Sequence, residues 1–79
     1  MEKIYLLQIR MIFLDGNSQD TTIGYTTKQK ALSAWIKEVC EFQIKYKVDK
    51  DLHNAIGDVL MNCQDVVAHF WVEELKIEE

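Results

Sequence analysis

The stretch that decides the fold runs from Lys3 to Leu14 and reads KIYLLQIRMIFL. Isoleucine, leucine, tyrosine and phenylalanine dominate it, and β-branched and aromatic side chains are enriched in β-strands. Because successive side chains of a strand point to opposite faces, the odd positions from Tyr5 to Phe13 form one fully apolar face. The sequence therefore predicts a long strand that is also partly apolar on its other face, where Ile4, Leu6, Gln8, Arg10 and Ile12 lie.

A turn and a second strand are expected directly after this stretch. The residues of 15–18, Asp-Gly-Asn-Ser, tolerate positive φ angles and form local hydrogen bonds. The β-prone segment 21–26 comes next. Two such segments joined by a short turn predict a β-hairpin.

A helix is expected to begin near Lys28. Thr26 or Thr27 can cap it, and Gln29 stands three residues after Thr26, as in a capping box. Apolar residues then recur at helical spacing, which predicts a helix packed on the sheet. Its expected apolar face consists of Ala31, Leu32, Trp35, Ile36, Val39, Cys40, Phe42 and Tyr46.

The segment from Asp49 to Cys63 predicts a second helix. Asp49 is a plausible N-cap, and the apolar residues after it continue at helical spacing. These are Leu52, Ile56, Val59, Leu60 and Cys63.

The tail 65–79 fits two structures. Residues 66–72 alternate as a strand does and are rich in β-branched and aromatic side chains, which favours a strand with a bulge at Glu73-Glu74. A heptad spacing through the same residues would alternatively let one helix run from Asp49 nearly to the end of the chain.

The fold class expected from these elements is α+β, in a single domain over residues 1–79. The prediction is a small three-stranded antiparallel sheet, with the N-terminal strand between its hairpin partner and the C-terminal strand. Two helices would pack on one face of this sheet. The alternative is a β-hairpin followed by two helices, the second of them long. A chain of 79 residues has room for one hydrophobic core.

Charge and hydropathy exclude several classes of partner. Thirteen acidic and nine basic residues give a net charge of −4, so a polyanion meets a weakly repulsive field and no direct nucleic-acid partner is expected. The longest apolar runs are far shorter than the roughly 20 residues that span a bilayer, and residues 1–16 do not read as a signal peptide. We expect no membrane partner and a cytoplasmic location.

No motif predicts catalysis or a metal site. Cys40, His53, Cys63 and His69 lack the paired spacing of structural zinc ligands, and both cysteines are interpreted as reduced and buried. A chain this small also leaves little room for a water-excluding pocket. We expect no catalytic residue, no metal, no cofactor and no small-molecule substrate, and the protein is not predicted to be an enzyme.

Five short segments carry a resemblance. They are Lys-Ile-Tyr-Leu-Leu at 3–7, Asp-Gly-Asn at 15–17, Ile-Gly-Tyr at 23–25, Thr-Lys-Gln-Lys-Ala at 27–31 and Phe-Trp-Val-Glu-Glu-Leu at 70–75. In these the chain resembles short uncharacterised α+β proteins of bacteria and their phages. The resemblance implies a small antiparallel sheet with helices on one side, and an accessory role of the anti-defence or anti-CRISPR type.

The surplus of apolar and aromatic side chains predicts a protein partner, because a core of this size cannot bury them all. Two functions are predicted as alternatives. In the first, the protein is an inhibitor whose acidic end and exposed apolar residues bind a surface of a host defence complex. In the second, it is a self-assembling structural or regulatory module. A homodimer is expected. The predicted partner-binding residues are Ile4, Leu6, Trp71, Glu73, Glu74, Leu75 and Glu78.

Overall fold

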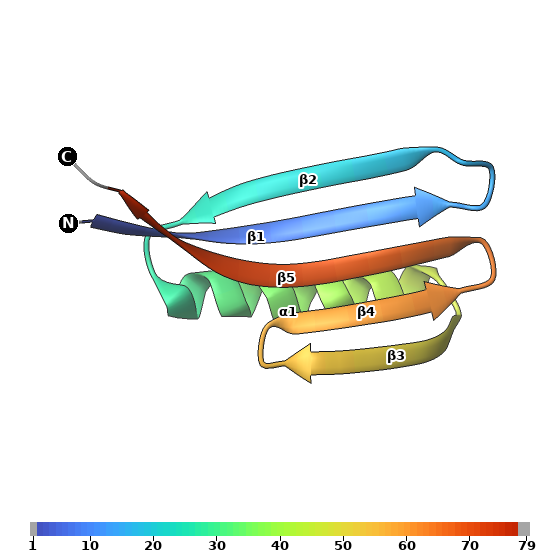
Figure 1. Ribbon diagram of the computed structural model, residues 1–79. Coiled ribbons are helices and arrows are strands. Elements are labelled where there is room, and N and C mark those ends of the chain that lie inside the picture. Colours follow the sequence, from blue (N-terminus) through green and yellow to red (C-terminus); the bar gives the residue numbers. More distant parts are fainter. Residues whose placement is uncertain (1, 78–79) are drawn as a thin grey trace.

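Over residues 2–77, which the computed structural model describes, five strands form one antiparallel sheet and one helix packs on it (Figure 1). The strand order is β2-β1-β5-β4-β3, so the two longest strands lie side by side inside the sheet. The elements are β1 (Glu2–Phe13), β2 (Ser18–Tyr25), α1 (Lys28–Lys45), β3 (Val48–Ala55), β4 (Asp58–Cys63) and β5 (Val66–Ile77).

The predicted fold class is wrong in its count of strands and helices. Residues expected to form the second helix instead form β3 and β4, which pair as an antiparallel hairpin. The alternative with a long second helix is also wrong, because β5 is a strand throughout. The hairpin turns at Gly57, whose φ of +80° fits the third position of a type II turn and would end any helix there.

The burial of β4 shows the strand period directly. Val59 and Met61 are fully buried against the helix side, while Asn62 is exposed. β3 shows no alternation of buried and exposed residues, because it is an edge strand and its residues after Val48 are exposed. Charged residues on an edge strand also discourage pairing with other chains. Edge position therefore explains why the segment lacks the alternation of a half-buried strand.

The predicted hairpin of β1 and β2 is confirmed. The two strands pair in continuous register from Tyr5 opposite Tyr25 to Ile12 opposite Ser18. Gly16 adopts a φ of +93°, and the Asn17 amide donates a hydrogen bond of 2.9 Å to Asp15 Oδ1. This is the local side-chain bonding that the turn residues predicted.

The pairing of the first strand with the last is also confirmed, but the predicted bulge in the last strand is wrong. β1 and β5 pair without interruption from Glu2 opposite Ile77 to Phe13 opposite Val66. Glu74 lies on the helix side of the sheet, where Lys3 Nζ is 3.3 Å from its Oε1 and lowers the pKa of the carboxyl. Both side chains are exposed there, so this end of the face needs no apolar residue.

The core lies between α1 and the strands β1, β5 and β4. Trp35 is partly buried, and its indole Nε1 donates a hydrogen bond of 2.9 Å to the Phe70 carbonyl oxygen. The expected helix face is too broad, since Ile36 and Cys40 are exposed: one helix on a sheet buries only a narrow stripe. The buried apolar residues are Leu7, Ile9, Ala31, Val39, Phe42, Val59, Met61, Val66, Ala68 and Phe70.

Within residues 2–77, α1 is the one helix, and it lacks an apolar stretch that could cross a bilayer. Its N-cap is Thr27, whose side chain accepts a hydrogen bond of 3.2 Å from the Lys30 amide.

Removal of this cap gives a first prediction. Thr27→Ala should lower the free energy of unfolding by about 1 kcal/mol, because a helix amide loses its acceptor. Denaturant unfolding followed by circular dichroism measures it. Thr26→Ala is the matched control and should leave stability nearly unchanged; equal losses from the two variants would contradict the assignment of Thr27 as the cap.

Candidate functional site

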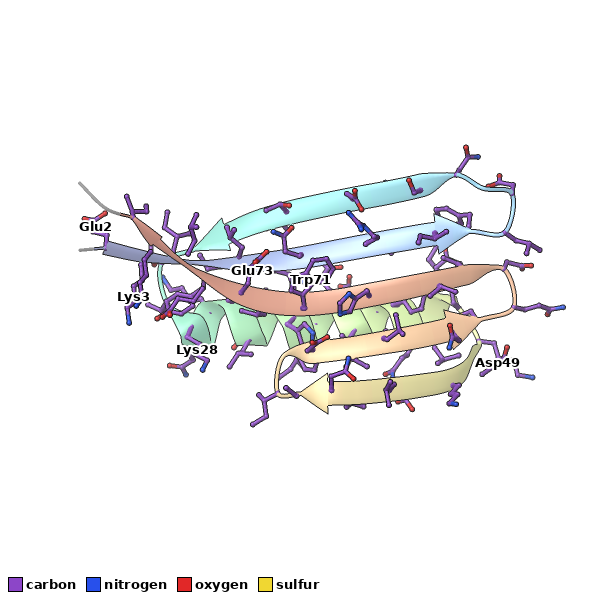
Figure 2. All side chains as sticks on the ribbon, in the orientation of Figure 1. Glu2, Lys3, Lys28, Asp49, Trp71 and Glu73 are labelled. Carbon is purple, nitrogen blue, oxygen red and sulfur yellow. The ribbon has the colours of Figure 1, made fainter. Side chains whose placement is uncertain are left out.

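The face of the sheet opposite α1 has no covering element in residues 2–77. Figure 2 shows Trp71 and Glu73 on the side of the ribbon away from the helix. We call this surface the open face. By the strand register it consists of Ser18, Asp20, Thr22 and Gly24 of β2, Ile4, Leu6, Gln8, Arg10 and Ile12 of β1, Val67, His69, Trp71, Glu73 and Leu75 of β5, Asp58, Leu60 and Asn62 of β4, and Lys50 and Leu52 of β3.

Trp71 lies on the central strand of the sheet and is held in place by its neighbours. Its ring stacks on the His69 ring, with centroids 4.2 Å apart and planes at 25°. His69 Nε2 lies 2.6 Å from Asp58 Oδ1 on β4. An aromatic side chain fixed in this way loses little conformational entropy when it binds a partner.

Polar contacts continue from Trp71 toward β2. Gln8 Nε2 donates a hydrogen bond of 2.6 Å to Glu73 Oε1, and Gln8 Oε1 accepts one from the Thr22 hydroxyl. Next to them, Arg10 Nε lies 2.9 Å from Asp20 Oδ1. The middle of the open face is therefore polar. We call these contacting residues the polar belt: Gln8, Arg10, Asp20, Thr22 and Glu73, with the Trp71 ring beside them.

Apolar residues flank this belt at both ends. Leu75 lies opposite Ile4 near the chain termini and is 50% exposed. At the other end Ile12, 50% exposed, lies opposite Val67, 37% exposed. The open face thus presents two apolar ends to solvent.

The structure brings together five of the seven predicted partner-binding residues. Ile4, Leu6, Trp71, Glu73 and Leu75 all lie on the open face. Glu74 lies on the opposite face, because adjacent residues of a strand alternate.

Glu78 is outside the described residues. The sequence did not predict the polar belt, nor Val67 beside Ile12 at the second apolar end, although counting in steps of two from Trp71 reaches His69 and Val67.

The pair of His69 and Asp58 resembles two members of a catalytic triad, in which an acid orients an imidazole. A triad also needs a hydroxyl or thiol beside the imidazole. The register neighbours of His69 across the sheet are Arg10 and Leu60, and Trp71 stacks on it. None of these three residues is a nucleophile, so the third member of a triad is not among them, and the contact of the pair is with Trp71.

The four zinc-ligand candidates are spread over the molecule. Within residues 2–77, no three His, Cys, Asp or Glu side chains gather as a metal site would need. The expectation that both cysteines are buried is wrong for Cys40, which is exposed on α1. Burial raises the pKa of the Cys63 thiol, and the Asp49 carboxylate raises it further, so Cys63 stays protonated at neutral pH.

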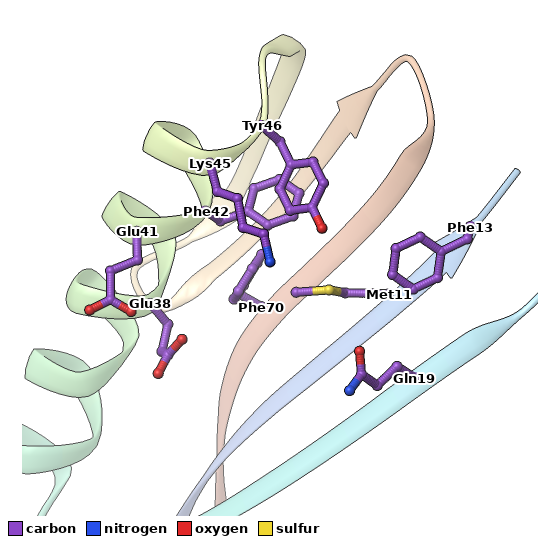
Figure 3. A pocket seen from close by; sticks show the side chains of 9 residues that line it. All are labelled: Met11, Phe13, Gln19, Glu38, Glu41, Phe42, Lys45, Tyr46 and Phe70. Atoms are coloured by element: carbon purple, nitrogen blue, oxygen red, sulfur yellow. The ribbon is translucent and has the colours of Figure 1, made fainter.

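A hollow of about 260 Å³ lies on the helix side of the sheet, between α1 and β1 (Figure 3). Phe42, Tyr46 and Phe70 line it together with the oppositely charged Lys45 and Glu38.

Comparison of the chain with protein-family models, curated proteins and solved structures yields no match. These comparisons contribute no phage or anti-defence relative. The assignment to a phage or anti-CRISPR class is therefore corrected: the chain is described only as a small α+β protein with a five-stranded sheet and one helix.

Proposed function

We propose that this protein is a non-enzymatic protein–protein interaction module that binds through the open face. One observation carries the proposal: α1 covers a single face of the sheet, and the other face exposes Trp71 between two apolar ends. Exposed apolar patches are one mark of an interaction site, and the open face has two of them, one at each end of the polar belt. Tryptophan is also among the residues most enriched at interface hot spots.

The charges of the open face favour a protein partner over nucleic acid. A single-stranded nucleic acid could stack its bases on Trp71, but it needs a basic groove for its phosphates. Asp20 and Glu73 belong to the polar belt, and Asp58 lies next to Trp71. The guanidinium of Arg10 is already paired with Asp20. Phosphates would therefore meet carboxylates.

An acidic end that docks on a basic partner receives less support than self-association. Glu74 faces the other side of the sheet and is paired with Lys3, so the acidic groups do not form one surface. The open face itself carries both signs of charge. A cytoplasmic location is part of this proposal, supported by the free thiol of Cys40 on the surface, since reduced cysteines persist in a reducing compartment.

The second prediction tests the proposal through Trp71. Trp71→Ala should weaken binding of any partner, self or other, by about thirtyfold, as expected of a hot-spot residue. The measurement is the amount of each protein held by the immobilised chain from extracts of its source cell. The same variant is measured in parallel for self-association by sedimentation.

Ile44→Ala is the matched control. Ile44 is 86% exposed on α1 and far from the open face in the fold, so its loss should change no binding. Equal binding by wild type and Trp71→Ala, or no binding and no self-association by the wild type, would rule out the proposed function.

A further inference from the structure

The register of β1 against β5 divides the open face into five rows. In order along the strands the rows are Ile4–Leu75, Leu6–Glu73, Gln8–Trp71, Arg10–His69 and Ile12–Val67. The first and the last row are apolar. The second row carries a carboxylate, the third row carries an amide and an indole, and the fourth row carries a guanidinium and an imidazole. Along β1 and β5 the rows are therefore apolar, acidic, neutral, basic and apolar, while Asp20 of β2 lies beside Arg10 and Asp58 of β4 lies beside Trp71.

We infer that the occupant of the open face is a second copy of this chain. The inference rests on the proposed function and names its partner. The two copies are related by a two-fold axis that lies between the sheets, perpendicular to the strands, and crosses the row of Gln8 and Trp71. A two-fold interface uses the same patch on both copies, so the patch must be complementary to itself.

Rotation about this axis reverses the order of the rows. The apolar row with Leu75 then lies against the apolar row with Val67 of the second copy. Glu73 lies opposite His69 of the second copy and next to its Arg10, whose guanidinium would lie between Glu73 and its own partner Asp20. The register of a single chain thus produces a surface that matches its own rotated copy.

The other simple two-fold arrangement, with the axis along β5, matches less well. It would place every row against itself, so that Glu73 faces Glu73 and His69 faces His69. Like charges across an interface cost several kcal/mol in wrong pairings, which is why the perpendicular axis is favoured. In the favoured arrangement the whole central row faces its own counterpart, and Asp58 is its one charged residue, 2.6 Å from the Nε2 of His69 in its own chain.

The size of the face fits a small dimer interface. After the rotation β1 and β5 meet their counterparts along their whole lengths, but β4 and β3 meet theirs only at the central row, because β4 begins at Asp58. With strands about 4.8 Å apart this overlap is roughly 500 Å² per copy. Two copies would bury roughly 1,000 Å², about the smallest area of a specific interface. Packed sheets of this kind cross at about 30° and interleave their side chains.

The third prediction tests both the partner and the register by charge exchange. Wild type should sediment at twice 9.3 kDa. Leu75→Lys and Val67→Glu should each raise the dissociation constant about a hundredfold, because one substitution alters two symmetric contacts. An equimolar mixture of the two variants should dimerise again, since residue 75 of one copy then meets residue 67 of the other with opposite charge.

Recovery in the mixture cannot come from chains that fail to fold, and circular dichroism of each variant checks folding independently. Ile44→Lys on the exposed side of α1 is the control and should remain dimeric. Mixing without recovery overturns the proposed axis. If wild type is monomeric but still captures another protein through Trp71, the inference of a second copy is wrong and the proposed function stands. If wild type is monomeric and captures no protein through Trp71, the proposed function is wrong as well.

Discussion

Phe70→Ala should destabilise the protein by about 3 to 5 kcal/mol, the cost of a cavity left by a buried aromatic ring. Phe70 is 1% exposed and contacts Phe42 edge to face, with ring centroids 5.3 Å apart. A domain of this size has a total stability of roughly 4 to 12 kcal/mol, so this single change removes a large share. Urea unfolding followed by circular dichroism measures the loss.

Trp71→Ala is the matched comparison, because it changes the next residue of the same strand on the opposite face. Its ring is partly exposed, so we expect a loss of only about 1 kcal/mol in the isolated chain. The carbonyl of Phe70 that accepts from Trp35 remains in both variants, which leaves packing as the difference. Similar losses for the two variants would show that the open face is part of the core.

The N-terminal half of the fold could be predicted from the sequence because its signals are local and agree with one another. The apolar strand, the turn at Gly16 and the cap at Thr27 each specify the element that forms there. The pairing of β1 with β5 was also predicted, from strands that are long and apolar. In these segments the spacing of the apolar residues matches the structure.

The segment 49–63 misled the analysis for a physical reason. Leu52, Ile56, Val59 and Leu60 fit a helical spacing by coincidence, while β3 is an edge strand with polar residues on both faces and therefore shows no period of two. The better signals were Gly57 between two short segments and the alternation within β4. Gly57 in the middle of the proposed helix costs about 1 kcal/mol relative to alanine, which disfavours a helix there.

The candidate site could be predicted only in part. Ile4, Leu6, Ile12, Trp71 and Leu75 were predicted to be surplus apolar residues, and they share the open face. The contacts of His69, and the placement of Glu74 on the other side, depend on the register of β5 with its neighbours. Register is a property of paired strands, so a single strand taken alone did not reveal it.

Gly57→Ala should destabilise the protein by about 1 to 3 kcal/mol, mainly through backbone strain and in smaller part through a contact with α1. Gly57 has a φ of +80°, which costs a residue with a Cβ about 1 to 2 kcal/mol. An added Cβ would also lie 2.8 Å from Leu32 Cδ2 on α1 and 3.7 Å from Val72 Cβ. The turn of the β3–β4 hairpin lies close to the helix, so an added methyl group requires the end of the Leu32 side chain to shift. Thermal unfolding measures the combined cost.

Gly16→Ala separates the two effects. Gly16 has a comparable φ of +93°, and an added Cβ there meets nothing within 4 Å, so its cost reports backbone strain alone. The excess cost of Gly57→Ala over Gly16→Ala is then the contact with Leu32. Adding Leu32→Ala should remove that excess, so the double variant should be more stable than the two single losses added together. If the loss of the double variant equals the sum of the losses of Gly57→Ala and Leu32→Ala, the added methyl group does not contact Leu32. Equal losses for Gly57→Ala and Gly16→Ala would lead to the same conclusion.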